Sequence, residues 1–409
     1  MPGMIPRALA SSAQKAFAEY PVVTLTGPRQ SGKTTLARSL FDLPYVNLEA
    51  PDDREFATRD PRAFLARYAD GAIIDEIQRA PDLTSYLQGH VDETNRSGQF
   101  VLTGSYDFAV REQVSQSLAG RTALLTLLPL SQEELGNAGL AGQSHYQDML
   151  AGGYPRIYDK GLNPTEFHRD YVGTYLERDL RQLSAVRDLS QFQTFMRLCA
   201  ANIGALLNLN RLANDCGISQ TTATEWLTLM EASYVLFRLQ PYFANTRKRL
   251  VKRPKLYFHD TGLACFLLGI TAPLHLEHHP LRGAIFENWV ISEVMKFDTA
   301  HNHFADLAFY ADAGGHEIDL LYRPGADLVP IEIKSGQTFH SDYFKGISYF
   351  AKHFPSHPGM IVYAGATSQQ RSDGQGVVAV RELPQFLHGL QGAPLNSLQA
   401  AAQTASRQR

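Results

Sequence analysis

The chain has 409 residues, of which 44% are hydrophobic and 19% are charged, and this length can form about two to three domains with hydrophobic cores. The formal net charge of −3 excludes a chain that is basic overall, so nucleic-acid binding would depend on local basic patches. Three scattered cysteines without a C-x-x-C pair indicate a reducing compartment and argue against a zinc ribbon. No apolar run reaches the ~18 residues of a membrane span and the first residues lack a signal-peptide core, so we expect a cytoplasmic protein with no membrane partner.

Residues 20–130 alternate between apolar, β-branched runs and helix-forming stretches. Such alternation predicts an α/β fold in which helices cover both faces of a parallel sheet. The predicted strands are Val22–Thr26, Tyr45–Leu48, Ala72–Ile77, Phe100–Gly104 and Ala123–Leu128.

A phosphate-binding loop follows the first predicted strand, because the sequence fits the pattern G-x-x-x-x-G-K-[ST] at every fixed position. A helix-forming stretch comes next, so backbone N–H groups and the helix N-terminus would cradle an anion. We expect Lys33 to reach the β- and γ-phosphates of ATP and the Thr34 hydroxyl to hold Mg²⁺. The expected nucleotide-binding residues are Gly27, Pro28, Arg29, Gln30, Ser31, Gly32, Lys33, Thr34 and Thr35.

Two acids lie at the end of the third predicted strand. At this edge of a sheet, nucleotide hydrolases place carboxylates that hold Mg²⁺ and activate water. We therefore expect Asp75 to be a metal ligand and Glu76 to be the general base that polarises the attacking water. The fourth predicted strand ends in hydroxyls, so Ser105 or Thr103 would contact the γ-phosphate or the water, unless they are ordinary turn hydroxyls.

These features resemble the AAA-type branch of the P-loop ATPases, and in particular a bacterial ATPase family whose C-terminal half is a domain of unknown function. The resemblance covers nearly the whole chain and implies ATP binding and hydrolysis. The blocks that carry it are Thr26–Thr35, Ile74–Gln78, Leu102–Ser105, Ser117–Arg121 and Gly152–Pro155.

Hydrolysis also needs a positive charge in the transition state, which an arginine commonly supplies from the same chain or from a neighbouring subunit. Arg121 is the first candidate, and Arg156 and Arg178 follow. The alternative for each is an ordinary surface or ion-paired arginine. If a neighbour supplies the arginine, hydrolysis would require a homo-oligomer.

The middle of the chain, from about residue 165 to 234, has a helical pattern. Within Leu209–Leu227, Gly217 separates two short helical stretches and Ser219 can cap the second one, which is the pattern of a helix-turn-helix. A β-rich run and the basic segment Arg247–Lys255 follow. This order resembles a winged helix with a basic strip for phosphate contacts, so DNA is an expected partner. The alternatives are a packing module and a solvated charged surface.

Two further strands are predicted near the C-terminus, at His316–Tyr322 and Leu328–Lys334, with a turn between them. If the hairpin is centred between Gly325 and Ala326, Asp319 faces Glu332. Lys334 shares the face of Glu332 because strand side chains alternate, and Glu317 would lie nearby.

Two carboxylates and a lysine on one sheet face are costly unless a divalent cation compensates them, and oxygen ligands suit Mg²⁺ or Mn²⁺. We expect Asp319 and Glu332 to hold this ion, which would activate water for attack on a phosphodiester, with Lys334 as an assisting catalytic residue. The arrangement resembles the PD-(D/E)XK nuclease superfamily, and this resemblance implies a further metal-ligating glutamate, matched here by Glu287. An edge-strand ion pair and a nuclease fold kept only for binding are the alternatives.

These observations predict an ATP- and Mg²⁺-dependent protein that acts on DNA. The alternative is a nucleotide-dependent binding switch that does not cleave, and a small-molecule kinase fits the acids at residues 75 and 76 less well. The predicted parts are a P-loop ATPase domain (1–135), a helical, winged-helix-like region (136–250), an α/β restriction-endonuclease-like domain (251–390) and a disordered tail (391–409).

Overall fold

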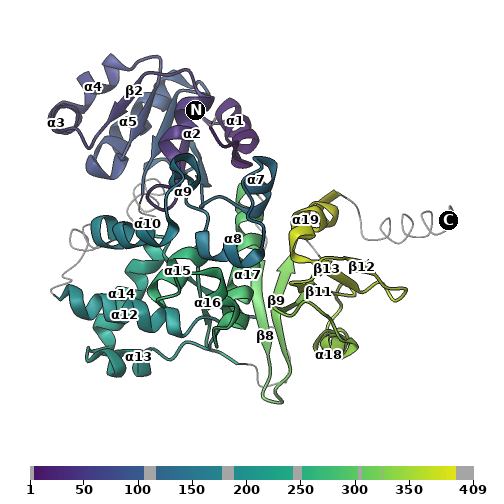
Figure 1. The fold of residues 1–409 in the computed structure, drawn as a ribbon. Helices are drawn as coiled ribbons and strands as arrows, with labels where there is room; N and C mark the ends of the chain where they lie inside the picture. Colours follow the sequence, from purple (N-terminus) through teal and green to yellow (C-terminus); the bar gives the residue numbers. More distant parts are fainter. Residues whose placement is uncertain are drawn as a thin grey trace.

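In the computed structural model, an N-terminal α/β unit, a group of helices and a second sheet follow one another along the chain (Figure 1). Residues 393–409, most of the predicted tail, lie outside the described part. The structure describes residues 4–105, 117–176, 188–242, 251–302, 306–325 and 327–392.

The N-terminal unit contains a five-stranded sheet with the strand order β2-β3-β4-β1-β5. All of its strand pairs are parallel, so the predicted parallel α/β sheet is confirmed. Each of the five predicted strands is present, and no strand end differs from its prediction by more than two residues. The strands are β1 (Val22–Thr26), β2 (Tyr45–Asn47), β3 (Ala72–Asp75), β4 (Phe100–Thr103) and β5 (Thr122–Thr126).

Helices cover both faces of this sheet, as predicted. Val23 and Ile73 contact one helix layer, whereas Ile74 and Leu102 contact the other. Both faces are therefore buried, which explains why the strands are apolar at nearly every position. One layer consists of α1 (Leu9–Glu19) and α2 (Lys33–Leu40), and the other consists of α3 (Pro51–Arg59), α4 (Pro61–Arg67) and α5 (Leu83–Thr94).

The middle of the chain is helical, as predicted. Gly217 adopts a φ of +70° at the end of α13, a left-handed conformation that favours glycine, and the Ser219 hydroxyl caps α14 by accepting a hydrogen bond from the Thr222 N–H (3.0 Å). The predicted pair of helices around a glycine turn is therefore confirmed. None of the described helices combines the length and the apolar composition that crossing a membrane requires. The helices are α7 (Gln132–Asn137), α8 (His145–Ala151), α9 (Pro155–Lys160), α10 (Pro164–Tyr171), the π-helix η2 (Val172–Leu176), α12 (Leu189–Ala201), α13 (Leu209–Cys216), α14 (Gln220–Ala232), α15 (Thr261–Leu267) and α16 (Pro273–Glu277).

The second sheet is mixed and has the strand order β12-β13-β11-β10-β9-β8-β6-β7. Its strands β6 and β7 pair with each other across the predicted boundary at residue 250, and β6 also joins β8. The helical region and the C-terminal region therefore share one sheet. The strands are β6 (Leu236–Pro241), β7 (Lys255–Phe258), β8 (Asp306–Ala311), β9 (Glu317–Arg323), β10 (Val329–Lys334), β11 (Met360–Tyr363), β12 (Gln369–Gln370) and β13 (Gly376–Ala379).

The predicted C-terminal hairpin is present as β9 and β10. The observed pairs Val329 with Tyr322 and Ile331 with Leu320 have the register that a turn centred between residues 325 and 326 predicts. Asp319 immediately precedes Leu320 on β9, and the same register places it opposite Glu332 in the middle of β10. The sequence therefore predicted both the strands and their alignment correctly.

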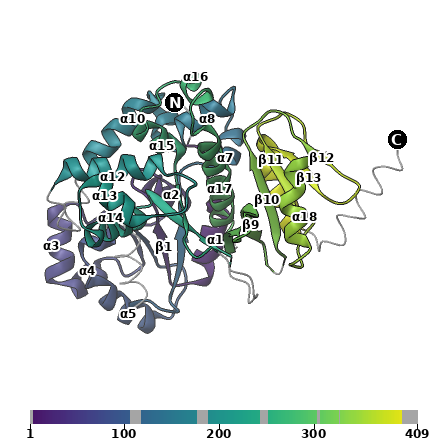
Figure 2. The same cartoon turned by 90° about the horizontal axis from the view of Figure 1, so that it is seen from below.

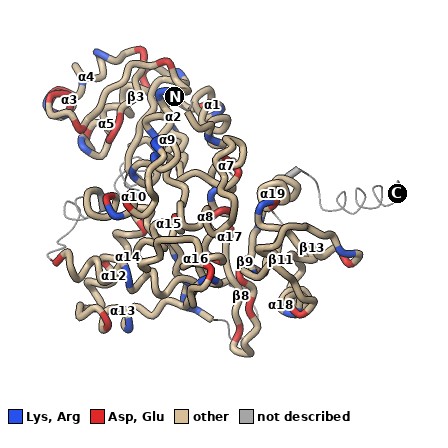
Figure 3. The backbone as a smooth tube through the Cα atoms, viewed as in Figure 1, with Lys and Arg blue, Asp and Glu red and all other residues tan. Residues whose placement is uncertain are grey.

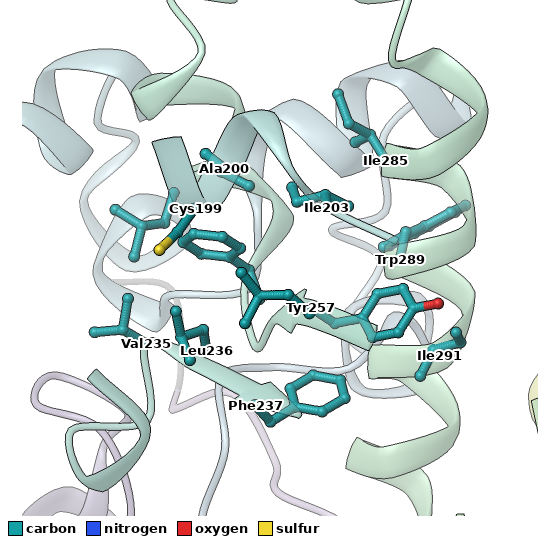
Figure 4. Close-up of a cluster of buried hydrophobic side chains, with 14 of the residues drawn as sticks. Cys199, Ala200, Ile203, Val235, Leu236, Phe237, Tyr257, Ile285, Trp289 and Ile291 are labelled. Carbon is teal, nitrogen blue, oxygen red and sulfur yellow. The ribbon is translucent and has the colours of Figure 1, made fainter. Parts of the chain in front are cut away.

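A long helix, α17 (Arg282–Ala300), runs between the helical region and the second sheet (Figure 2). Its residues Ile285, Trp289 and Ile291 join one large hydrophobic core with side chains from the helices and from both ends of the sheet. Figure 4 shows the part of this core that includes β6 and β7. Burial of this shared apolar surface stabilises the two regions as a packed body. Two more helices accompany the sheet, α18 (Lys345–Ala351) and α19 (Leu383–Gly392).

Candidate functional site

The phosphate-binding loop connects β1 to α2 at the carboxyl edge of the five-stranded sheet. Gly27 has a φ of +140°, and a Cβ atom there would overlap the carbonyl oxygen of Leu127, so the position requires glycine. Gln30 and Gly32 also have positive φ angles, of 62° and 95°. These conformations turn the loop toward the N-terminus of α2, where backbone N–H groups favour an anion.

Lys33 is buried at the start of α2, and its ammonium group lies against the loop. Nζ donates hydrogen bonds to the carbonyl oxygens of Gly27 (2.9 Å) and Pro28 (2.8 Å). Burial lowers the pKa of Lys33 to about 8, while the nearby carboxylates of Glu76 and Asp75 oppose that shift. A cation in this place suits the charge of β- and γ-phosphates.

Asp75 ends β3 beside Thr34, the residue predicted to share Mg²⁺ with it. The Thr34 hydroxyl lies 3.1 and 3.0 Å from the two carboxylate oxygens of Asp75. The Tyr45 hydroxyl donates to the same carboxylate (2.8 Å), as does the Thr103 hydroxyl. This group of hard oxygen atoms at the sheet edge fits a magnesium ion.

Glu76 follows with a φ of +59°, a conformation that is costly for residues other than glycine and is common at functional sites. Its Oε1 atom accepts a hydrogen bond from the Ser105 hydroxyl (3.1 Å) and lies 4.0 Å from Nη1 of Arg29. Gln78 donates to the other carboxylate oxygen. Ser105 thus orients the predicted general base, while Thr103 contacts Asp75.

A cavity of about 570 Å³ opens between the loop and α9, and this volume is in the range of small-ligand sites. Pro155 and Arg156 line it from α9, opposite the loop. The predicted residues Gly27, Pro28 and Ser31 contribute backbone carbonyls that Lys33 or Arg7 binds. The predicted residues that line the cavity are Arg29, Gln30, Gly32, Lys33, Thr34, Thr35, Glu76 and Ser105. Loop, oxygen ligands and cavity together fit ATP with Mg²⁺.

Arg121 does not lie at this cavity. Its carbonyl oxygen accepts a hydrogen bond from Val22 at the amino end of β1, the sheet edge opposite the loop, and its guanidinium group forms an exposed ion pair with Asp92 (2.5 and 2.8 Å). Within its own chain Arg121 therefore lies away from the site. Two of the possibilities remain, a role toward a neighbouring subunit and an ordinary ion-paired surface arginine. Arg156 lines the cavity, and Arg178 lies outside the described residues.

Two supporting residues were not predicted. Arg7 donates to the carbonyl oxygens of Ser31 (2.7 Å) and Leu128 (2.6 Å) and pairs with Glu134 (3.0 Å). Tyr45 binds the metal-site carboxylate. Strand pairing would not have indicated Tyr45, because the residue of β2 level with Asp75 is Asn47. No sequence pattern links Arg7 to the loop.

The second helix of the helix-turn-helix, α14, presents a neutral polar surface. Gln220, Thr221 and Thr224 are exposed on it, and their amide and hydroxyl groups can form hydrogen bonds. However, the charged residues of α14 are Glu225 and Glu231. Lys and Arg are spread over all parts of the molecule and do not gather on α13 and α14 (Figure 3). This helix therefore offers hydrogen bonds but no positive charge to a nucleic acid.

The predicted basic strip is only partly described. Residues 247–250 lie outside the described residues, whereas Lys252 and Arg253 are exposed. Lys255 is only 5% exposed and forms ion pairs with Glu287 on α17 and with Glu317 on β9. The sequence predicted that Lys255 belongs to a phosphate-contacting surface. This prediction is wrong for Lys255, because its side chain is buried at the start of β7.

The hairpin of β9 and β10 brings together Asp319, Glu332 and Lys334, as predicted. Lys334 Nζ lies 2.8 Å from Glu332 Oε2 and 3.4 Å from Asp319 Oδ2. The Asp319 carboxylate also accepts a hydrogen bond from the Ile333 N–H (2.8 Å). We call Glu287, Glu317, Asp319 and Glu332 the acidic cluster.

Glu287 reaches this cluster from α17. It accepts hydrogen bonds from the Tyr257 hydroxyl (2.5 Å) and from Lys255 (3.3 Å), and Lys255 also pairs with Glu317. Burial raises the pKa of Glu287 to about 7, with a further contribution from the charge of Asp319. Neither Lys255 nor Tyr257 was predicted, because only the pairing of β6 with β7 brings β7 to this helix.

Glu332 is the most perturbed acid of the cluster. Burial raises its pKa to about 8, and the charge of Asp319 adds to this shift while Lys334 opposes it. Carboxylates that are costly to ionise are stabilised by a divalent cation, and the oxygen ligands present suit Mg²⁺ or Mn²⁺. Lys255 and Lys334 supply part of that compensation within the chain.

Comparison with known families gives three successive matches. Residues 19–136 match a family described as an AAA domain. Residues 143–274 and 282–383 match two families described as domains of unknown function, DUF8612 and DUF4143. The N-terminal match supports a nucleotide-binding ATPase and includes the loop, Asp75 and Glu76.

The chain is similar to two mycobacterial proteins, uncharacterized protein Rv2008c from Mycobacterium tuberculosis and uncharacterized protein Mb2031c from Mycobacterium bovis. Each is 34% identical over 293 residues, which are 70% of this chain and 65% of the relative. The chain thus spans slightly less than two thirds of the length of these curated relatives.

Proposed function

We propose that this chain hydrolyses ATP at the edge of the five-stranded sheet and couples hydrolysis to action on DNA by the helical region and the second sheet. The observation that carries this proposal is the meeting of Lys33, Thr34 and Glu76 around one cavity. The Asp75 carboxylate lies directly behind it, within hydrogen-bond distance of the Thr34 hydroxyl. The AAA-domain match over residues 19–136 supports the nucleotide chemistry. The DNA-directed part of the proposal depends on the helix-turn-helix and on the acidic cluster.

Each residue of the nucleotide site has a distinct role in this proposal. Lys33 and the loop N–H groups bind the phosphates, and Thr34 and Asp75 hold Mg²⁺, which would neutralise charge on the leaving phosphate. Glu76, oriented by Ser105, positions a water molecule and accepts its proton. Arg156 would place a positive charge on the opposite side of the cavity.

We expect Arg156→Ala to lower the rate of ATP hydrolysis at least about tenfold, because it removes the cavity-lining guanidinium group from α9. Arg121→Ala is the matched comparison, since that guanidinium pairs with Asp92 at the far edge of the sheet. Steady-state phosphate release from both variants checks this assignment. Loss of activity only in Arg121→Ala would contradict it and would indicate an arginine supplied by a neighbouring subunit.

The order of elements in the helical region supports a winged-helix role in DNA binding. Helix α12 comes first, followed by Leu206, which forms an isolated β-bridge with Lys255. Helices α13 and α14 come next, and then the antiparallel strands β6 and β7. This is the order of helices and strands in a winged helix. Exposed Gln220, Thr221 and Thr224 on α14 would contact DNA through amide and hydroxyl groups, and Lys252 and Arg253 would contact phosphates.

The acidic cluster supports metal-dependent cleavage of DNA. Asp319, Glu332 and Glu287 would hold Mg²⁺ or Mn²⁺, which supplies an activated water. Lys334, bonded to both Glu332 and Asp319, would orient the attacking oxygen or stabilise the charge that develops on the phosphate. This combination of helix glutamate, strand aspartate and E-x-K strand resembles the PD-(D/E)XK nucleases.

We expect Asp319→Asn to abolish metal-dependent cleavage of supercoiled plasmid while ATP hydrolysis stays within about twofold of the wild type. Asp306→Asn is the matched control, because Asp306 is an exposed aspartate on the neighbouring strand β8. The assay contains Mg²⁺ or Mn²⁺, with and without ATP. Equal cleavage by both variants would show that the cluster is not the nuclease site.

One observation favours a second function, a nucleotide-dependent switch that binds DNA or protein without cleaving. Lys255 and Lys334 already form ion pairs with Glu287 and Glu332, so the acidic cluster is partly neutralised within the chain. A wild-type protein that hydrolyses ATP but never cleaves plasmid, with either metal, would establish this function over the first.

A further inference from the structure

Two histidines and a glutamate from three separate helices meet on the side of the molecule where α19 contacts α17. Glu133 comes from α7, His301 follows the last residue of α17, and His388 comes from α19. One potential ligand atom from each residue lies within 4.8 Å of those of the other two. Among the described residues this group is separate from both the nucleotide cavity and the acidic cluster.

The contacts between these side chains show that they are ordered against a common surface. His388 Nε2 lies 2.7 Å from Glu133 Oε1. The rings of His301 and His388 are nearly perpendicular, with centroids 5.0 Å apart. The Phe297 ring packs against both, at 4.4 Å from His301 and 4.8 Å from His388. An aromatic side chain from α17 therefore fixes where the two imidazoles lie.

A backbone hydrogen bond sets the tautomer of His301. Its Nδ1 atom lies 2.8 Å from the carbonyl oxygen of Phe297, and since a carbonyl only accepts, Nδ1 must carry the proton. Neutral His301 then has its lone pair on Nε2. Metal-binding histidines are commonly oriented in this way, with one ring nitrogen donating to a carbonyl and the other facing the ion.

We propose that Glu133, His301 and His388 form a binding site for a divalent transition-metal ion such as Zn²⁺. Two imidazole nitrogens and one carboxylate oxygen are a ligand set that Zn²⁺ accepts, with a fourth position left for water. The ligand chemistry differs from that of the acidic cluster, whose oxygen atoms suit Mg²⁺ or Mn²⁺. Binding of the ion does not require the nucleotide or DNA functions proposed above.

At this position an ion would connect helices that are far apart in the sequence. The neighbour of Glu133 on α7 is Glu134, which pairs with Arg7 (3.0 Å), and Arg7 holds the Ser31 carbonyl of the phosphate-binding loop (2.7 Å). An ion at the site would fasten α19 and the end of α17 to α7. It would therefore connect the C-terminal helix with the helix that supports the loop.

Calorimetric titration of the full, untagged, metal-stripped chain with Zn²⁺ tests the site. We expect one equivalent of Zn²⁺ to bind with an affinity that falls at least about tenfold in His301→Gln and in His388→Gln. His278→Gln is the matched control, because His278 is an exposed histidine outside the group, and it should bind like the wild type. Mg²⁺ in excess should not displace the ion.

Zinc X-ray absorption of the one-to-one complex gives a second measurement that does not depend on a variant folding correctly. Two imidazoles in the coordination shell, with the remaining ligands oxygen, would support the site. Thiolate sulfur in the shell would overturn the proposal, as would equal Zn²⁺ affinity in the wild type and in both histidine variants with unchanged circular dichroism spectra.

Discussion

Replacing Lys33 by alanine should lower the rate of ATP hydrolysis at least about 10²–10³-fold, the range for loss of one preorganised group that stabilises transition-state charge. The Lys33 ammonium group lies within the loop, 2.9 and 2.8 Å from the carbonyl oxygens of Gly27 and Pro28. A pKa lowered to about 8 by burial still leaves it mostly protonated at neutral pH, so it can neutralise phosphate charge. Phosphate release at saturating ATP and Mg²⁺ measures the effect.

Lys15→Ala provides the control for this prediction. Lys15 lies on α1 and is exposed, so the same chemical change should leave turnover near the wild-type value. The fold of the Lys33 variant is checked by its thermal unfolding. Hydrolysis by Lys33→Ala at the wild-type rate would rule out this loop as the catalytic nucleotide site.

Glu76→Gln should lower ATP turnover about 10²–10⁴-fold, the usual contribution of a general base, while ATP binding is retained. Glutamine keeps the size of the side chain and can still receive the Ser105 hydrogen bond (3.1 Å), but it cannot accept a proton from water. The variant should therefore trap ATP in the site. Single-turnover hydrolysis and equilibrium binding of ATP separate the two effects.

The matched control for Glu76 is Glu55→Gln on α3, where the glutamate forms an exposed ion pair with Arg59 (3.0 Å). That variant should hydrolyse ATP normally, because surface pairs of this kind contribute little. If Glu76→Gln also kept normal turnover, another group would have to activate the water. If it lost ATP binding instead, the role of Glu76 would be in holding the nucleotide or its metal.

The sequence was most informative where function depends on neighbours along the chain. The loop, Asp75 and Glu76 are each adjacent to a strand whose apolar pattern is clear, and parallel strands bring their carboxyl ends to one edge. Asp319 and Glu332 were placed opposite each other from the position of the hairpin turn, and Lys334 was placed beside Glu332 from the period of two in a strand. The observed register of β9 and β10 agrees with that placement.

The sequence was least informative where a contact depends on tertiary packing. Lys255 belongs to a basic run, yet β7 directs it into the acidic cluster. Arg121 belongs to a sequence block that carries the family resemblance, but it lies at the sheet edge opposite the phosphate-binding loop. Arg7 reaches the loop from a segment before α1 that has no motif. In each case the side chain's partner is distant in sequence, so no local period predicts it.

Two contacts connect the nucleotide loop physically with the rest of the molecule. The buried Tyr234 hydroxyl bonds with Thr26 (2.9 Å), the residue before the loop, and Tyr234 links α14 to β6 with a strained φ of +56°. Arg7 joins Ser31 to Glu134 on α7. A change in the loop on hydrolysis would therefore act directly on the helix-turn-helix and on the helices beside the second sheet.

If the nucleotide site and the proposed DNA-binding regions work together, the rate of ATP hydrolysis should depend on DNA concentration. We expect plasmid DNA to raise phosphate release by the wild-type chain in a saturable way, and Lys33→Ala to stay inactive at every DNA concentration. Wild-type hydrolysis that is unchanged by DNA would show that the two parts are not coupled.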